Sequence, residues 1–188
     1  MMKALFSFAI VVAGLLVASC GGKGSSGHAA EEVVVPEGFT TYEFANFSIS
    51  VPEEFTTSDA PDNLNVRFSS EAMLKHDDGE EYSSGAYIDC SFMNSGATTA
   101  QIKETATNMK LSQEAAGEIC NEPVIDGNII LMRHYHDNED GEAKVITWRW
   151  WLVSEDGKNI AGDIYYPDTE AKYYDDVAKK IVKTIKMK

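Results

Sequence analysis

One stretch, residues 143–154 (AKVITWRWWLVS), constrains the fold of this chain more than any other. As a β-strand it is apolar on both faces, with Ile146, Trp148, Trp150 and Leu152 on one side and Val145, Trp151 and Val153 on the other. Such a strand needs cover on both sides, unlike a strand at a solvated surface. The sequence therefore predicts a central strand between two layers of structure.

Three further strand-like runs are predicted beside it, at residues 119–125, 128–136 and 160–166. Acid and glycine residues separate the four runs, at Asp126-Gly127, 138–142 and Asp156-Gly157, and these are residues that tight turns favour. Pro123 lies inside the first run and restricts it to the edge of a sheet. The second half of the chain is therefore predicted to be an antiparallel meander.

Upstream, alternation of apolar and polar residues predicts shorter strands within 42–51, broken at Ala45-Asn46, and at 64–68 and 86–93. The intervening segment 73–85 (MLKHDDGEEYSSG) is typical of a charged loop.

Two helices complete the prediction. One begins at Thr98, where TTAQ matches a capping box, and ends near Gly117. The other begins at Asp168 and carries an apolar stripe that reaches Ile185. The predicted fold class is α+β, a largely antiparallel β-sheet covered by helices.

Three segments add a more specific pattern. Residues 42–55 (YEFANFSISVPEEF) place a proline and a bulky residue after a strand, 155–158 (EDGK) form a hairpin after the Trp-rich strand, and 181–186 (IVKTIK) close the last helix. In this order, over residues 40–188, they resemble the PsbP/Mog-like α/β/α sandwich. The resemblance implies a binding or assembly role, because the family includes the extrinsic PsbP subunit of the photosystem, a Ran-binding nuclear transport factor and bacterial lipoproteins. No site of that family transfers to named positions.

The N-terminal segment predicts export and lipidation. Lys3 precedes an apolar run at 4–17, which is shorter than the about 20 residues that a membrane-spanning helix needs. The sequence LVASC at 16–20 resembles the bacterial lipobox, in which the cysteine is diacylated and becomes the mature N-terminus. Cys20 is therefore expected to anchor the chain to a membrane. An uncleaved anchor and an ordinary secretory signal are the alternatives.

The lipobox sets the expected organisation and location of the chain. Residues 1–19 are the signal peptide, 20–36 are the lipidated cysteine and a Gly/Ser-rich tether, and 37–188 are one globular domain. Gly21 stands where signals for inner-membrane retention place an aspartate, which favours the outer membrane. Because no acidic cluster follows Lys23 closely, we expect the domain to face the periplasm rather than the cell surface.

Composition and motifs favour binding over catalysis. The formal charge is −14, with 30 acidic and 16 basic residues, and this balance opposes binding to nucleic acid. The sequence contains no GxSxG, HExxH or phosphate-loop motif, so we expect no catalytic residues and no cofactor. The leading hypothesis is a non-enzymatic accessory domain that binds a protein or envelope partner. The alternative is a lipoprotein that binds a small ligand or glycan through Trp148, Trp150, Trp151 and Tyr165, residues that core packing would also explain.

Two further residue sets leave alternatives open. His134 and His136 alternate on one strand face beside acids, which suits zinc, but two ligands are few and exposed histidines at a solvated hairpin are favoured, so no metal is predicted. Cys90 and Cys120 would form a disulfide in an oxidising compartment, or Cys90 is an ordinary small core residue between Ile88 and Phe92.

Overall fold

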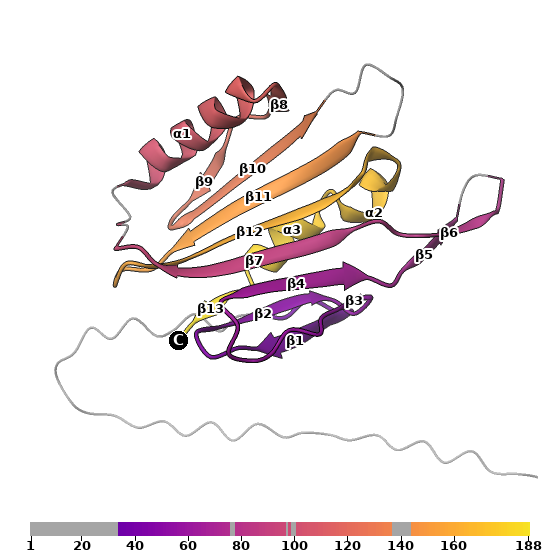
Figure 1. Cartoon of the computed structure of the whole chain (residues 1–188), viewed down its shortest axis with the longest axis horizontal. Coiled ribbons are helices and arrows are strands. Elements are labelled where there is room, and N and C mark those ends of the chain that lie inside the picture. The colour runs from indigo at the N-terminus through magenta and orange to yellow at the C-terminus, as the bar shows by residue number, and fades with distance from the viewer. Residues whose placement is uncertain (1–33, 76–77, 97, 99–100, 137–143) are drawn as a thin grey trace, which may run out of the picture. The chain divides into compact units, whose positions relative to one another are not determined.

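The computed structural model describes residues 34–75, 78–96, 98, 101–136 and 144–188 (Figure 1). The predicted signal peptide, Cys20 and the turn at 138–142 lie outside these residues. No helix in the described ranges is long and apolar enough to cross a bilayer.

An eight-stranded antiparallel sheet forms the centre of the domain (Figure 1). Its strands, in spatial order, are β3 (Phe55–Thr56), β4 (Asn65–Ser70), β7 (Tyr87–Asn94), β12 (Lys158–Pro167), β11 (Val145–Val153), β10 (Ile129–His136) and β8 (Glu118–Cys120), with β9 (Val124–Asp126) also pairing with β10. The predicted strand at 119–125 is split into β8 and β9 around Pro123, and both lie at the sheet edge as the proline requires.

Two smaller sheets accompany the large one. The first contains β1 (Phe39–Glu43), β2 (Phe47–Pro52) and β13 (Lys186–Met187). The second is a hairpin of β5 (Met73–Lys75) and β6 (Glu81–Ser83), so the prediction of a loop across 73–85 was wrong in part. Its short strands pair because Leu74 is buried opposite Tyr82 and Lys75 forms an ion pair with Glu81 (3.1 Å).

The main core lies on one face of the large sheet, where a 3₁₀ turn η2 (Asp168–Glu170) and helices α2 (Ala171–Tyr174) and α3 (Val177–Val182) pack together with the small sheet of β2. At its centre the fully buried Trp150 ring lies directly over Gly162 of the neighbouring strand. A Cβ atom on Gly162 would lie 2.3 Å from Trp150 Cζ2, so only glycine fits beneath this ring.

The opposite face of the sheet is covered at one end by α1 (Ile102–Ala115), which packs on β8, β9 and β10 (Figure 1). A second small core joins helix and sheet through Ala106, Ile130 and Val153, with Trp151 packed against it. β11 is thus apolar on both faces and covered on both, as predicted. The antiparallel sheet with helices on its two faces confirms the α+β fold class.

The two helix predictions need correction at their ends. The α-helix begins at Ile102 rather than Thr98, since Gln101 lies in a 3₁₀ turn in which its N–H donates to Thr98 O (2.9 Å), and the Thr98 side chain donates to Gln101 Oε1 (3.2 Å) instead of capping the helix. Half of the capping box is present, since the Thr98 backbone N–H also donates to Gln101 Oε1 (2.9 Å). Gly117, with φ of 88°, ends the helix as predicted.

The predicted C-terminal helix is three short pieces followed by a strand. The chain breaks between α2 and α3 at Asp175, whose carboxylate accepts a hydrogen bond from Tyr166 Oη (2.8 Å). After α3, the buried Thr184 Oγ1 accepts from Ser50 N (2.9 Å), and its one proton faces the carbonyl oxygens of Ile181 (2.7 Å) and Ser50 (3.1 Å). This side chain occupies the hydrogen-bonding edge of β2, and the residues after it continue along β2 as β13.

Candidate functional site

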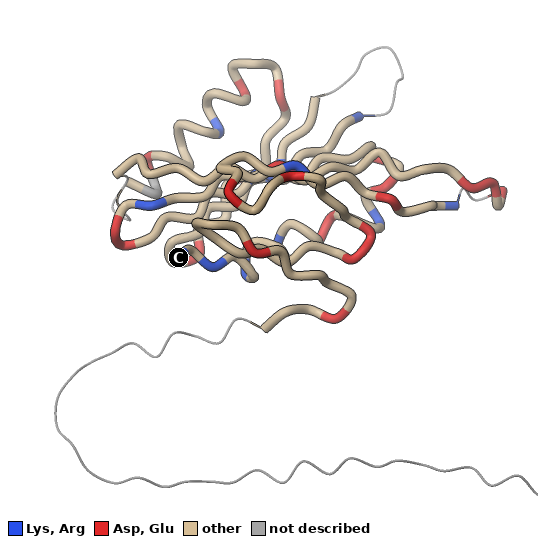
Figure 2. Tube along the Cα trace, turned by 60° about the horizontal axis from the view of Figure 1, so that its bottom comes forward, with Lys and Arg blue, Asp and Glu red and all other residues tan. Residues whose placement is uncertain are grey.

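The part of the sheet that α1 does not cover presents outward-pointing side chains of β4, β7, β12 and β11; we call it the open face. Its main members are Arg67, Tyr87, Asp89, Met93, Arg149, Asp163 and Tyr165. Figure 2 shows the acidic residues of the domain spread over several loops and turns, with Lys and Arg not gathered into one patch in that view.

A row of four charged residues crosses the open face at one level of the sheet. Strand register aligns Arg67 with Asp89, Asp89 with Asp163, and Asp163 with Arg149. Each arginine holds its aspartate with two hydrogen bonds, of 2.6 Å and 2.6 Å in Arg67–Asp89 and of 2.7 Å and 3.2 Å in Arg149–Asp163. The outer arginines thereby compensate two carboxylates that would otherwise repel each other across β7 and β12.

Two tyrosines lie beside this row and are stacked on each other. The rings of Tyr87 and Tyr165 are 5.5 Å apart at 26°, and Arg67 Cζ lies 5.7 Å and 5.9 Å from their centroids. Tyr165 Oη donates to Asp89 Oδ2 (3.3 Å). The hydrogen bond and charge of Asp89 raise the pKa of Arg67, and partial burial followed by Asp89 raises the pKa of Tyr165. Both groups therefore keep their protons at neutral pH.

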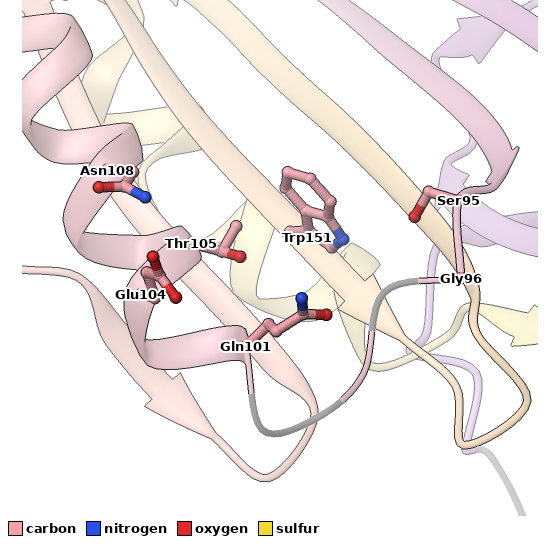
Figure 3. A pocket seen from close by; sticks show the side chains of 7 residues that line it. All are labelled: Ser95, Gly96, Gln101, Glu104, Thr105, Asn108 and Trp151. Atoms are coloured by element: carbon pink, nitrogen blue, oxygen red, sulfur yellow. The ribbon is translucent and has the colours of Figure 1, made fainter.

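A groove runs between α1 and the sheet, at the border of the open face (Figure 3). Its first half, of about 320 Å³, is lined by Ser95, Gly96, Gln101, Glu104, Thr105, Asn108 and Trp151. Its second half, of about 330 Å³, is lined by Thr105, Asn108, Met109, Ser112, Gln113, Arg149 and Trp151. Because Thr105, Asn108 and Trp151 line both halves, the two form one continuous depression, which we call the α1 groove.

The four aromatic residues predicted as a ligand platform do not form one surface. Trp148 and Trp150 face the α3 side of the sheet, where Trp150 is fully buried and Trp148 Nε1 donates to Asp175 (3.4 Å). Trp151 and Tyr165 lie on the other side, half-buried, but four residues apart along adjacent strands, or about 13 Å. Trp151 belongs to the α1 groove and Tyr165 to the tyrosine pair, so a role in ligand binding stays a prediction for these two separately.

The two predicted histidines differ sharply. His136 is exposed as expected, whereas His134 is buried under α1, with Nδ1 3.5 Å from Glu118 Oε2. The prediction of an exposed His134 was wrong, because α1 covers that face of β10. Burial, followed by the charge of Arg149, lowers the pKa of His134 and favours its neutral form. Nowhere in the described ranges do three metal-binding side chains converge.

Cys90 and Cys120 are both free thiols. They lie on β7 and β8, which are four strand spacings or about 19 Å apart, and a disulfide requires Cα atoms within about 7 Å. The disulfide alternative is therefore wrong, and Cys90 is the small buried core residue that the second alternative describes.

Sequence analysis did not single out the charged row or the tyrosine pair. Alternation along residues 86–93 already indicates that Tyr87 and Asp89 point away from the core. The missing information was strand register, because Arg67 and Asp89 are 22 residues apart and meet only through pairing of β4 with β7. The α1 groove depends likewise on where α1 rests on the sheet.

No family model and no curated protein sequence matches this chain. Among solved structures it is similar to the Ran-binding protein Mog1p of Saccharomyces cerevisiae, with a TM-score of 0.55 and 13% identity over 79% of this chain and 94% of that one. A point mutant of the protein Mog1 gives a TM-score of 0.54 and 13% identity over 79% and 95%. The chain has a Mog1-like fold.

This likeness confirms, at the level of fold, the resemblance indicated by residues 40–188. A protein from Bacteroides thetaiotaomicron is similar over 80% of this chain and 48% of its own length, with a TM-score of 0.47 and 12% identity. At these identities the Mog1-like fold is established and the chemistry of the site has to be argued from this chain alone.

Proposed function

We propose that this chain is a non-enzymatic binding domain, held at the cell envelope by a lipid on Cys20, that binds a protein partner through the open face. The observation that carries the proposal is the composition of that face. Tyr, Trp, Met and Arg are the residue types enriched in protein interfaces, and here Tyr87 and Arg67 lie against each other on a part of the sheet that none of the described helices covers, with Met93 exposed further along β7.

The arrangement of the open face suits binding without a large entropic cost. Arg67 is fixed by two hydrogen bonds to Asp89 and lies against the stacked rings of Tyr87 and Tyr165, so its guanidinium is already ordered in the free protein. Preordered side chains lose less freedom when a partner binds. The structural neighbour Mog1p is by its name a Ran-binding protein, which gives a binding role to this fold in one other protein.

Attachment to the outer membrane on its periplasmic side is the second part of the proposal. It depends on the lipobox at residues 16–20, and residues 21–36 would then act as the tether between lipid and domain. Mass spectrometry of the mature N-terminus tests it, because a lipidated protein yields a peptide that begins at Cys20 and carries several acyl chains. A Cys20→Ala variant should accumulate as an unlipidated precursor. An unmodified Cys20 in the wild-type protein would refute the anchor.

Site-specific photo-crosslinking in intact cells tests the open face. Tyr87 and Tyr173 are 37% and 42% exposed, and Tyr173 lies on α2, which packs on the other side of the sheet. Benzoylphenylalanine at position 87 should give a discrete crosslinked envelope protein, while the same group at position 173 should not. Arg67→Ala should lower the yield from position 87 by at least about fivefold, the equivalent of 1 kcal/mol of binding energy.

The Arg67→Ala variant remains folded in this design, because the Arg67–Asp89 pair is largely exposed and contributes little to stability. Crosslinks of equal yield from positions 87 and 173, or none from position 87, would contradict binding at the open face.

A further inference from the structure

We infer that the α1 groove is a second binding site, separate from the protein-binding open face, and that it takes a neutral oligosaccharide. The groove combines an aromatic floor with a wall of mostly uncharged hydrogen-bonding side chains and the Glu104 carboxylate, along a depression with two connected parts of about 320 and 330 Å³. Figure 3 shows Trp151 at its base, opposite the side chains of Gln101, Glu104, Thr105 and Asn108.

The groove exists because α1 is unusually polar on the side that borders the sheet. Gln101, Thr105, Asn108 and Ser112 recur at helical spacing and form one stripe along α1. Only Ala106 of the described α1 side chains is fully buried, so the helix rests on the sheet through a small contact. Beside Trp151 the sheet carries the small residues Ala161 and Ser91 at the same level, which leaves space next to the indole ring.

The hydrogen-bonding groups of the groove match a polyhydroxylated ligand. The amide of Asn108 and the hydroxyl of Thr105 each donate and accept, which suits sugar hydroxyls that do both, and the Gln101 amide contributes its N–H₂ group as a donor. Gln101 Oε1 is already occupied by Thr98, so its amide N–H₂ is oriented by a fixed partner. The Glu104 carboxylate can accept from two neighbouring hydroxyls at once.

The aromatic floor supplies the second part of sugar recognition. Trp151 is half-buried, so part of the side chain is accessible for packing against sugar C–H groups. The ring packs against its neighbours Ile130 and Val153 on the same face of the sheet, which holds it as an apolar surface. The stripe from Gln101 to Gln113 extends about 18 Å, which is long enough for several sugar units in a row.

Charge selects a neutral ligand over an acidic one. Arg149 is the one basic residue that lines the groove in the described structure, and its charge is balanced by Asp163, which accepts from Arg149 Nε (2.7 Å) and Nη2 (3.2 Å). The other charged residue that lines the groove is Glu104, whose carboxylate repels phosphate, sulfate and uronate groups. The geometry therefore points to uncharged sugars rather than to acidic polysaccharides or phosphorylated ligands.

Titration of the full-length protein with defined oligosaccharides tests this inference. The protein is purified in a detergent without a sugar headgroup, and linear tetrasaccharides of glucose, mannose, xylose and N-acetylglucosamine are compared with a tetrasaccharide of galacturonic acid. We expect at least one neutral probe to bind with a dissociation constant below about 1 mM by calorimetry, and the acidic probe to bind at least about tenfold more weakly.

Matched variants locate the site. Asn108→Ala and Trp151→Phe should each weaken the neutral probe, the former by at least about fivefold. Thr107→Ala, at an exposed position on the same helix outside the groove, and Trp148→Phe, on the opposite face of the sheet, should leave its affinity unchanged. Asn108 is exposed, so its variant tests the groove even if Trp151→Phe alters packing.

Failure of every neutral probe to bind below about 1 mM would overturn the inference. Equal binding by the Asn108→Ala and Thr107→Ala variants would overturn it as well. Neither result affects the protein-binding proposal, which depends on crosslinks from position 87 on the open face.

Discussion

Gly162→Ala is the substitution for which the structure predicts the largest effect from the smallest change. The added Cβ would lie 2.3 Å and 2.4 Å from Trp150 Cζ2 and Cε2, and 2.7 Å from the carbonyl oxygen of Asp89. Ordinary contacts begin near 3.4 Å, so the indole would have to move by about 1 Å, and the Asp89 carbonyl belongs to the β-ladder. Trp150 is fully buried between the sheet and α3, which leaves it no free direction.

The magnitude follows from these contacts. Overpacking of a dense core costs about 1–3 kcal/mol, and complete displacement of a buried Trp costs about 3–5 kcal/mol. Because ring and carbonyl both clash, we expect the free energy of unfolding to fall by about 3–5 kcal/mol. For a domain of this size each kcal/mol lowers Tm by about 2–4 °C, so Tm should fall by at least about 6 °C.

Urea unfolding followed by tryptophan fluorescence measures this loss, and Gly85→Ala is the matched control. A Cβ on Gly85 would meet only Pro167, at 3.5 Å, and its φ is not positive, so the control should remain within about 1 kcal/mol of the wild type. The double variant Gly162→Ala/Trp150→Leu should be less destabilised than the sum of its parts, since the smaller side chain removes the clash. A Gly162→Ala protein as stable as Gly85→Ala would refute the packing argument.

Three further predictions concern single buried groups. The pKa of His134 is lowered in the folded state, so the free energy of unfolding should fall as pH drops below about 6.5. In urea titrations at several pH values, His134→Gln should remove the part of this pH dependence that His134 causes. A pH dependence that the substitution leaves unchanged would contradict the prediction. Glu170 is buried and accepts hydrogen bonds from Ser84 Oγ (2.8 Å) and Gly85 N (3.0 Å). Glu170→Ala should therefore lower the free energy of unfolding by about 2–3 kcal/mol in the same urea assay, and a loss under about 1 kcal/mol would count against this prediction. Thr184→Val should lower the free energy of unfolding by about 1–3 kcal/mol and increase amide hydrogen exchange in β13. Wild-type protection of the β13 amides in this variant would disprove the prediction.

The strands of the large sheet could be predicted from the sequence because each carries its own periodic signal. Residues 128–136, 143–154 and 160–166 were predicted to within about two residues of β10, β11 and β12. The hairpin of β5 and β6 gave no such signal, since Leu74 is its one buried residue and its remaining pairing is polar. β13 was missed because Thr184 stops the apolar helical pattern only through its contact with Ser50, 134 residues away.

The candidate site was less predictable, for a different physical reason. Trp150 and Trp151 are neighbours in the sequence, yet one fills the core under α3 and the other borders the α1 groove. Alternation separates the two side chains but cannot say which face is packed and which is left accessible. That depends on the length and position of the covering helices.

The extent of α1 determines how much of the sheet stays uncovered. Its 14 residues span about 21 Å, and it packs on β8, β9 and β10 at one end of the eight-stranded sheet. β12, β7 and β4 extend beyond that cover by about three strand spacings, or 14 Å. The sequence of these uncovered strands is consistent with permanent exposure, since it places paired Arg and Asp residues and stacked tyrosines where a covered sheet would need aliphatic side chains. An aliphatic open face would have required a second covering helix, and a uniformly polar one would offer a partner little to bind, so the mixture that is present is the composition that the proposed binding role requires.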